Sequence, residues 1–129
     1  MAALYFTVDE ALNILSANNM LPDAVRDVKP DGDGLLVTVA GGIEISVRQE
    51  SFIAGVLRLS YSSKSWAFKL ADSLGKVDAI VDDAIRPHPF IRRQGASLVI
   101  DLNSALQARV KGMQIREFTI RDGSVTIGF

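Results

Sequence analysis

The sequence predicts an α+β domain in which a curled antiparallel β-meander and a C-terminal hairpin pack on about three short helices. Three observations lead to this class: alternating apolar residues broken by turn signals, two apolar stripes at helical spacing with a third helix marked by its caps, and the pair Asp122-Gly123 near the C-terminus. An antiparallel sheet with one apolar face needs cover for that face, and the three helices are the cover available. The length of 129 residues fits a single domain spanning residues 1–129.

The first predicted element is a helix over about residues 8–18. Thr7 and Glu10 have the spacing of the N-cap and N3 residues of a capping box, which marks the start of the helix. Apolar residues then recur at helical spacing, at Val8, Ala11, Leu12 and Leu15. Asn18-Asn19 and Pro22 end the helix.

A run of strands follows, and the turns between them set the pairing. Pro30-Asp31-Gly32-Asp33 turns a strand near residues 24–29 back into a strand that starts at residue 34. Residues directly opposite in an antiparallel pair share a face. A two-residue glycine turn after Ala40 would set Val39 against Glu44, whereas a three-residue loop sets it against Ile43. We therefore predict the three-residue loop Ala40-Gly41-Gly42, which gives the apolar pairs Val39–Ile43, Val37–Ile45 and Leu35–Val47.

The next predicted hairpin turns at a loop closed by Tyr61 and Trp66 and completes a five-strand meander. Its register joins two further apolar pairs, Leu59 with Phe68 and Leu57 with Leu70. Arg58 and Lys69 then point to the opposite face, so the hairpin has one apolar and one polar side. We interpret its aromatic residues as packing between strands and not as a cofactor site.

Residues about 74–85 are predicted to form the second helix. Their apolar stripe consists of Val77, Ile80, Val81 and Ala84. Pro87 cannot continue a helix and disfavours helical geometry at Arg86. A short strand is then predicted at residues 97–100.

The last third of the chain predicts a helix and a hairpin. Asp101-Leu102-Asn103-Ser104 offers caps for a helix through about Lys111, and Gly112 stands where a C′ glycine belongs. Asp122-Gly123 is a preferred pair for a type I′ turn. That turn sets a register in which apolar residues are opposite each other on one face, and threonines on the other. The pairs are Ile120–Val125, Phe118–Ile127 and Thr119–Thr126.

Composition excludes several classes of function. A formal net charge of −1 gives no basic field for nucleic acid. The absence of cysteine excludes disulfides, cysteine-ligated zinc, iron–sulfur clusters and thiol nucleophiles. No apolar run is long enough to predict a membrane-spanning segment. The N-terminus has no basic segment of a secretory signal, so we expect a cytoplasmic protein, or a periplasmic or membrane-associated one if a leader is missing.

No metal site, cofactor or enzymatic activity is predicted. Asp31-Gly32-Asp33-Gly34 resembles the start of a calcium loop, but its twelfth position is Gly42 where a bidentate Glu is expected. Asp82 and Asp83 are adjacent on a helix, point about 100° apart and are interpreted as a solvated face. His88, the only histidine, lies between two prolines, and no nucleophile motif accompanies it. A hydrolase-like site at His88 is kept as an alternative.

The stretch Ile85-Arg86-Pro87-His88-Pro89-Phe90-Ile91-Arg92-Arg93 is the most unusual in the chain. It holds the only histidine and two of the four prolines. Arg86, Arg92 and Arg93 could cradle an anionic head group through fork-like hydrogen bonds, with Phe90 and Ile91 as apolar contacts. The alternative is a solvent-exposed linker between a helix and a strand.

The segment LVIDLNSALQARVKGMQIREFTIRDGSVTIGF, residues 98–129, resembles the closing segment of bacterial tubular lipid-binding (TULIP-like) domains. The resemblance is carried by the step Ile100-Asp101-Leu102-Asn103 into a short helix and by a hairpin that turns at Asp122-Gly123. It implies a curled sheet wrapped around a long helix, with an apolar groove for an acyl chain. It also implies a protein that is exported or membrane-associated.

Two functions are expected from these observations. The first is a non-enzymatic binding module for a lipid or other long apolar ligand, held between a helix and an apolar groove formed by Leu57, Leu59, Phe68 and Leu70. The proportion of 48% hydrophobic residues and the mean hydropathy of +0.22 agree with it. The second is a structural or interaction domain without a small-molecule ligand. It would form a homodimer through its apolar sheet surface or through an edge at the C-terminal strand, which ends at Phe129.

Overall fold

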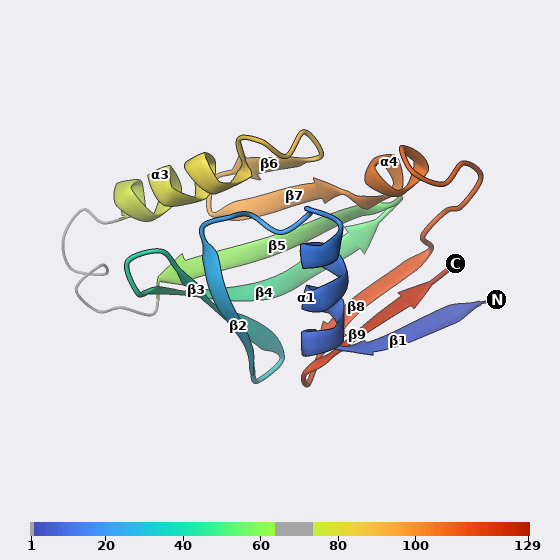
Figure 1. Ribbon diagram of the computed structural model, residues 1–129, viewed down its shortest axis with the longest axis horizontal. Coiled ribbons are helices and arrows are strands. Elements are labelled where there is room, and N and C mark those ends of the chain that lie inside the picture. The colour runs from blue at the N-terminus through green and yellow to red at the C-terminus, as the bar shows by residue number, and fades with distance from the viewer. Residues whose placement is uncertain (1, 64–73) are drawn as a thin grey trace.

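The computed structural model describes residues 2–63 and 74–129, and it confirms the α+β class (Figure 1). The described residues form two antiparallel sheets and three helices. In chain order the elements are β1 (Ala3–Thr7), α1 (Val8–Ala17), β2 (Val25–Asp31), β3 (Gly34–Val39), β4 (Ile43–Ile53), β5 (Val56–Ser63), α3 (Leu74–Ile85), β6 (Ile91–Gln94), β7 (Ser97–Asp101), α4 (Leu102–Gln107), β8 (Glu117–Arg121) and β9 (Ser124–Gly128).

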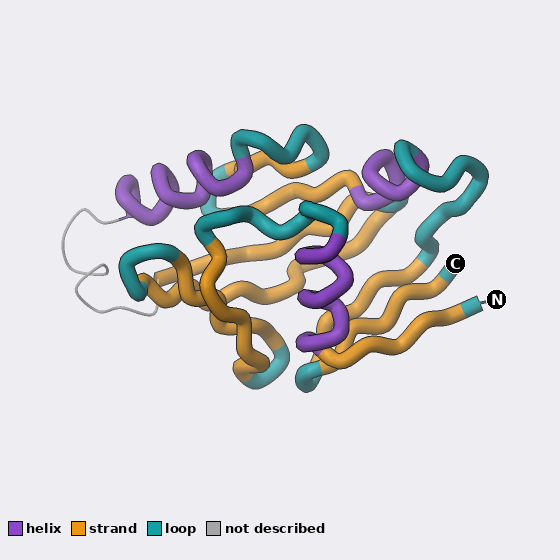
Figure 2. The backbone as a smooth tube through the Cα atoms, viewed as in Figure 1, coloured by secondary structure: helices purple, strands orange, loops and turns teal. Residues whose placement is uncertain are grey.

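The larger sheet has six strands in the order β2-β3-β4-β5-β7-β6, and the smaller has three in the order β1-β9-β8. Figure 2 shows the strands in these two groups. Helix α1 contacts β2 of the larger sheet and also β1 and β9 of the smaller one. The longest helix in the described ranges, α3, has 12 residues, and no helix there is long and apolar enough to cross a membrane.

The hairpins predicted from turn chemistry are confirmed. The three-residue loop pairs Val39 with Ile43, and Val37 with Ile45, as expected. The C-terminal hairpin pairs Ile120 with Val125. Its turn residues Asp122 and Gly123 have φ values of 50° and 78°, and a type I′ turn requires positive φ at both positions. The capping box between Thr7 and Glu10 is also present at the start of α1.

The predicted pairing of Leu59 with Phe68 and of Leu57 with Leu70 is wrong. Both edges of β5 are occupied at these positions, because Leu59 lies between Gln49 and Leu98, and Leu57 lies between Phe52 and Ile100. The neighbour of β5 is therefore β7, whose Leu98 and Ile100 match the same apolar alternation. Phe68, Leu70 and Trp66 lie outside the described residues, as does the predicted fifth strand of the meander.

Two strands and one helix boundary also differ from the prediction. Strands β1 and β6 were not predicted, and both are short edge strands. Helix α4 ends at Gln107 and not near Lys111, so Gly112 is not its C′ residue although its φ is 85°. The C-terminal strand β9 lies between β1 and β8, so it is a central strand and not the open edge that was predicted.

One face of the six-stranded sheet, here called the inner face, carries the core. It presents Leu57, Leu59 and Tyr61 of β5, which are at most 8% exposed. Helix α3 covers this part of the face with Val77 and Val81, and Val77 is only 1% exposed. Burial of a large apolar side chain is worth about 1.5–3 kcal/mol, so this cluster is what holds α3 on the sheet.

The smaller sheet packs on the inner face beside α3. The rings of Phe52 on β4 and Phe118 on β8 lie 6.1 Å apart between centroids. The side chain of Gln49 donates to the carbonyl oxygen of Phe118 (2.7 Å) and accepts from the amide of Ile120 (2.8 Å). Gln49 thereby satisfies two outward backbone groups of β8, in the way that a neighbouring strand would.

Candidate functional site

The unusual stretch predicted as either a site or a linker is divided between three elements. Ile85 ends α3, a tight turn follows, and Ile91 begins β6. The turn is closed by hydrogen bonds from the His88 amide to the Ile85 carbonyl (2.8 Å) and from the Ile91 amide to the His88 carbonyl (3.2 Å). Its last residues belong to the edge strand of the larger sheet, so the stretch is not simply a linker.

The three predicted head-group arginines do not come together. Arg86 lies just beyond α3 and pairs with Asp83, with 2.6 Å between Nη2 and Oδ1. Arg92 and Arg93 are adjacent on β6, and successive side chains of a strand point to opposite faces. Arg93 therefore lies on the inner face under α3, and Arg92 on the opposite, outer face.

Arg93 fixes α3 to the sheet through a polar cluster, here called the Arg93 latch (Tyr61, Asp78, Asp82 and Arg93). Its guanidinium donates to both carboxylate oxygens of Asp82, at 2.7 and 3.1 Å. It also lies 3.4 Å from an oxygen of Asp78, which accepts a hydrogen bond from the Tyr61 hydroxyl. Bidentate pairs of this kind are the strong ones, because two parallel hydrogen bonds add to the charge attraction.

The electrostatics of the latch follow from these contacts. The hydrogen bonds from Arg93 lower the pKa of Asp82 below its ordinary value. Burial, and then the hydrogen bond to Asp78, raise the pKa of Tyr61 far above its ordinary value of 10.0. The hydrogen bond to Asp82 also raises the pKa of Arg93, so the pair stays charged across the physiological range. Asp82 and Asp83 bind different arginines, so they do not act together. The predicted solvated face is wrong for Asp82, which faces the sheet and binds Arg93.

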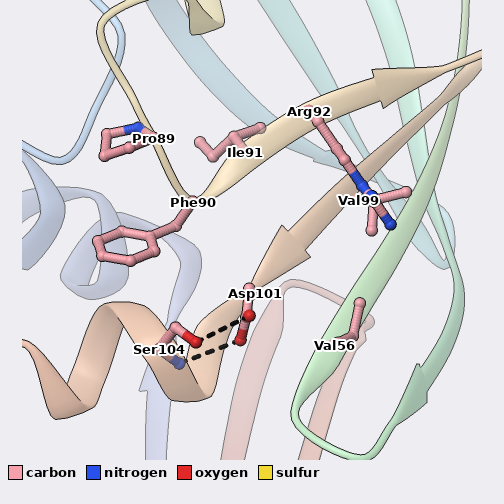
Figure 3. A pocket seen from close by; sticks show the side chains of 8 residues that line it. All are labelled: Val56, Pro89, Phe90, Ile91, Arg92, Val99, Asp101 and Ser104. Atoms are coloured by element: carbon pink, nitrogen blue, oxygen red, sulfur yellow. Dashed lines mark hydrogen bonds between the residues drawn. The ribbon is translucent and has the colours of Figure 1, made fainter.

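Arg92 lines a hollow of about 440 Å³ on the outer face, here called the outer hollow (Figure 3). Its lining residues are Val56, Pro89, Phe90, Ile91, Arg92, Val99, Asp101 and Ser104. Val99 of β7 is opposite Arg92 and forms the floor, with 5% of its surface exposed. Within the described ranges no hydrogen bond or ion pair engages the Arg92 guanidinium.

The acidic residue of the outer hollow is already engaged. Asp101 is the N-cap of α4 and accepts hydrogen bonds from the amide of Ser104 (3.0 Å) and from its hydroxyl (2.8 Å), as Figure 3 shows. Arg58, on the other side of Val99, donates to the side-chain oxygen of Gln94 (2.7 Å). The hollow therefore combines an apolar floor with one cation that has no acidic partner among the described residues.

Helix α4 is held beside this hollow by the turn between β4 and β5. The Leu102 amide donates to the Gly55 carbonyl (3.0 Å), and the side chain of Asn103 accepts from the Ile115 amide (2.7 Å). Gly55 has a φ of 81°, and a Cβ there would lie 2.1 Å from the Asn103 side chain. Glycine is thus required where α4 docks.

His88 lines a second, larger hollow of about 880 Å³ between the α1–β2 connection and the end of α3. Ser16 and Asp83 also line it. The imidazole of His88 makes no hydrogen bond in the described part of the chain, so no base–nucleophile pair with Ser16 is formed there. Groups of three or more His, Asp or Glu side chains that could hold a metal ion are also missing from the described residues. Asp31-Gly32-Asp33-Gly34 forms the tight turn between β2 and β3.

The two described residues of the predicted apolar groove are both buried. Leu57 and Leu59 belong to the core cluster that α3 covers, with 3% and 8% of their surfaces exposed. The residues of the outer hollow that the sequence analysis missed include Val56 and Val99. Val56 lies on the side of its strand that was expected to be polar, because it shares that side with Arg58. For the strand of Val99 no face was predicted.

Comparisons with family models, with curated proteins and with solved structures found no match to this chain. The resemblance of residues 98–129 to tubular lipid-binding domains has no support from them. The strand, short helix and hairpin expected of that segment are observed, as β7, α4, β8 and β9. The long enclosed helix that the resemblance implies is not found in the described ranges.

Proposed function

We propose that this protein is a non-enzymatic binding module whose ligand is a small amphipathic anion, of the medium-chain fatty acid type, held in the outer hollow. The observation that carries the proposal is the Arg92 guanidinium, which lies beside the apolar floor at Val99 and has no partner among the described residues. Arg86 and Arg93 are each paired with a carboxylate on α3, whereas Arg92 has no acidic partner in the described part of the chain.

The shape and chemistry of the hollow fit this class of ligand. A volume of about 440 Å³ is within the usual range for small-molecule sites, roughly 300–1,000 Å³. Val56, Val99 and the ring of Phe90 supply apolar contact for a short alkyl chain. The planar guanidinium of Arg92 matches a carboxylate or a phosphate through two parallel hydrogen bonds.

The ligand is proposed on the outer face because the inner one is already filled. A chain between the sheet and α3 would have to displace Val77 and Val81 from Leu57, and the Arg93 latch would have to open. The resemblance to lipid-binding domains agrees with the proposed ligand class, although that resemblance implies a ligand enclosed by the sheet. The proposed ligand is still apolar with an anionic head group, as the sequence predicts, but it lies on the outer face of the sheet and not on the inner one.

The experiment is a titration of the protein with octanoate, followed by the methyl signals of Val, Leu and Ile in NMR spectra. We expect saturable shifts at Val56 and Val99, and none at Val77 or Val81. Arg92→Gln should weaken octanoate binding by roughly tenfold or more, because a hydrogen bond to a charged group contributes about 1.5–3 kcal/mol. The same substitution should leave binding of the neutral octanol unchanged.

Arg86→Gln is the matched control, since it removes an arginine from the same stretch that is paired with Asp83 and does not line the hollow. It should leave octanoate binding unchanged. Val56→Phe fills the hollow with a residue that strands accommodate well and should abolish the shifts. The proposal fails if octanoate causes no saturable shift at these methyls, or if Arg86→Gln and Arg92→Gln weaken binding equally.

A further inference from the structure

Four strands form the edges of the two sheets in the described part of the chain, and one of them lacks the usual protection. Natural edges avoid pairing with other chains by means of charges, proline or a covering group. Strand β2 carries Pro30 and several charges, and β6 carries Arg92 and Arg93. On β8, Gln49 covers the edge by binding the carbonyl oxygen of Phe118 and the amide of Ile120. Strand β1, with the sequence ALYFT, has no charge and no proline.

The side chains of β1 are exposed as well as apolar. Leu4 is 47% exposed and Tyr5 is 75% exposed, and both are among the most exposed large hydrophobic residues of the described chain. Leu4 is opposite Ile127 and so lies on the face of the smaller sheet that packs toward the core. Tyr5 is opposite Thr126 and points to the other face. Pairing along this edge would remove apolar surface from water on both faces.

The backbone of β1 shows which groups are free. Val8 donates to the carbonyl oxygen of Gly123 (3.1 Å), and Ala2 accepts from Phe129 (2.8 Å), so the even-numbered residues direct their backbone groups at β9. In an antiparallel pair this direction alternates along the strand. The N–H and C=O groups of Ala3 and Tyr5 therefore point away from β9. Thr7 also points outward, and its amide donates to Glu10 in the capping box.

We infer that β1 is a self-association edge, and that its partner is β1 of a second copy of this chain, antiparallel and centred on Leu4. In this register Ala3 is opposite Tyr5 of the second copy, and the free groups of these two residues form four hydrogen bonds around a twofold axis. Leu4 is opposite Leu4 of the second copy. The two smaller sheets then become one continuous sheet.

A second copy fits this edge because the edge is complementary to itself. A register centred on Tyr5 would place Ala3 opposite Thr7, whose amide is already engaged by Glu10. The Leu4-centred register uses only the free groups and leaves the capping box intact. The strand has no charge, so no like charges meet across the twofold axis. The contact is small, so we expect a weak dimer with a dissociation constant on the order of 100 µM.

The experiment is sedimentation of the full chain over a concentration range from about 10 µM to about 1 mM, which brackets such an equilibrium. We expect a reversible monomer–dimer equilibrium. Tyr5→Pro removes an outward amide and keeps every bond to β9, because proline is tolerated where the N–H of an edge strand faces solvent. It should abolish the dimer, and the circular dichroism spectrum should stay that of the folded protein.

A charge exchange at position 4 tests the register. Leu4→Lys and Leu4→Glu should each prevent self-association, and an equimolar mixture of the two should recover it, since only this register places position 4 opposite itself. Ile53→Lys is the control, because Ile53 is 70% exposed and lies on β4, away from this edge. A protein that is monomeric at every concentration overturns the inference, as does a dimer that Tyr5→Pro leaves intact.

Discussion

On the inner face of the six-stranded sheet, Arg93 is held by Asp82 and Asp78 beneath α3. On the outer face its neighbour Arg92 lies beside Val99, and none of the described acidic residues pairs with it. A charge on the covered face must be paired, because removing it from water without a partner is costly. A charge on the uncovered face keeps its hydration and can exchange it for a ligand. We therefore assign stability to the inner face, and we propose that binding takes place on the outer one.

The largest difference in the effect of substitution on stability is expected between two adjacent residues of β5. Leu57 lies in the core with 3% exposure, and Val56 lines the outer hollow. Leu57→Ala should lower the free energy of unfolding by about 2–5 kcal/mol, because it removes apolar contact and leaves a cavity. Val56→Ala should cost less than about 1 kcal/mol, since its site is already open to water. Urea denaturation measures both, and equal costs would contradict the assignment of the two faces.

A smaller contrast is expected between the two arginines of β6. Arg93→Gln removes the bidentate pair with Asp82 and should lower the melting temperature, whereas Arg92→Gln should leave it unchanged. The pKa of Asp82 is lowered in the folded protein, so its contribution is present above the ordinary value of 3.8 and is lost as the pH falls through the lowered value. The difference between Arg93→Gln and the unmodified protein should therefore shrink in acid. A difference that persists after Asp82 is protonated would argue against the latch.

The smallest contrast concerns Tyr61, at the base of the same latch. Its pKa is raised in the folded protein, so the stability that the hydroxyl contributes is fully present below pH 10.0, the ordinary value, and is lost as the pH rises toward the raised value. The stability of the unmodified protein should fall above this pH more steeply than that of Tyr61→Phe, as measured by urea denaturation across alkaline pH. If stability falls with pH equally steeply in both proteins, ionisation of the Tyr61 hydroxyl does not cause the loss of stability.

The parts of the fold that were predictable are those set by local chemistry. The turn at Ala40-Gly41-Gly42 and the turn at Asp122-Gly123 each fix a register, because one shift of register would mix apolar and polar faces. The partner of β5 was not predictable in the same way. Leu98 and Ile100 offer the same alternation as Phe68 and Leu70, and the alternation alone does not decide which strand is adjacent.

The candidate site was predictable in its residue types and not in its geometry. The stretch around Arg92 was singled out by its composition, but the alternation that separates Arg92 from Arg93 requires knowing that β6 is a strand. Four residues with two adjacent arginines carry almost no strand signal. Strand β1 was missed for a related reason, since its pairing partner β9 lies more than a hundred residues away in the chain.

The most direct measurement of the central claim uses a fatty acid that carries a nitroxide spin label on its alkyl chain. The label broadens NMR signals of nearby methyl groups, so it compares the two faces of the sheet in one spectrum. We expect strong broadening at Val56 and Val99, reversed by an excess of unlabelled octanoate, and sharp signals at Val77 and Val81. Broadening at Val77 and Val81, with Val56 and Val99 unaffected, would place the ligand under α3 and rule out the outer hollow as the binding site.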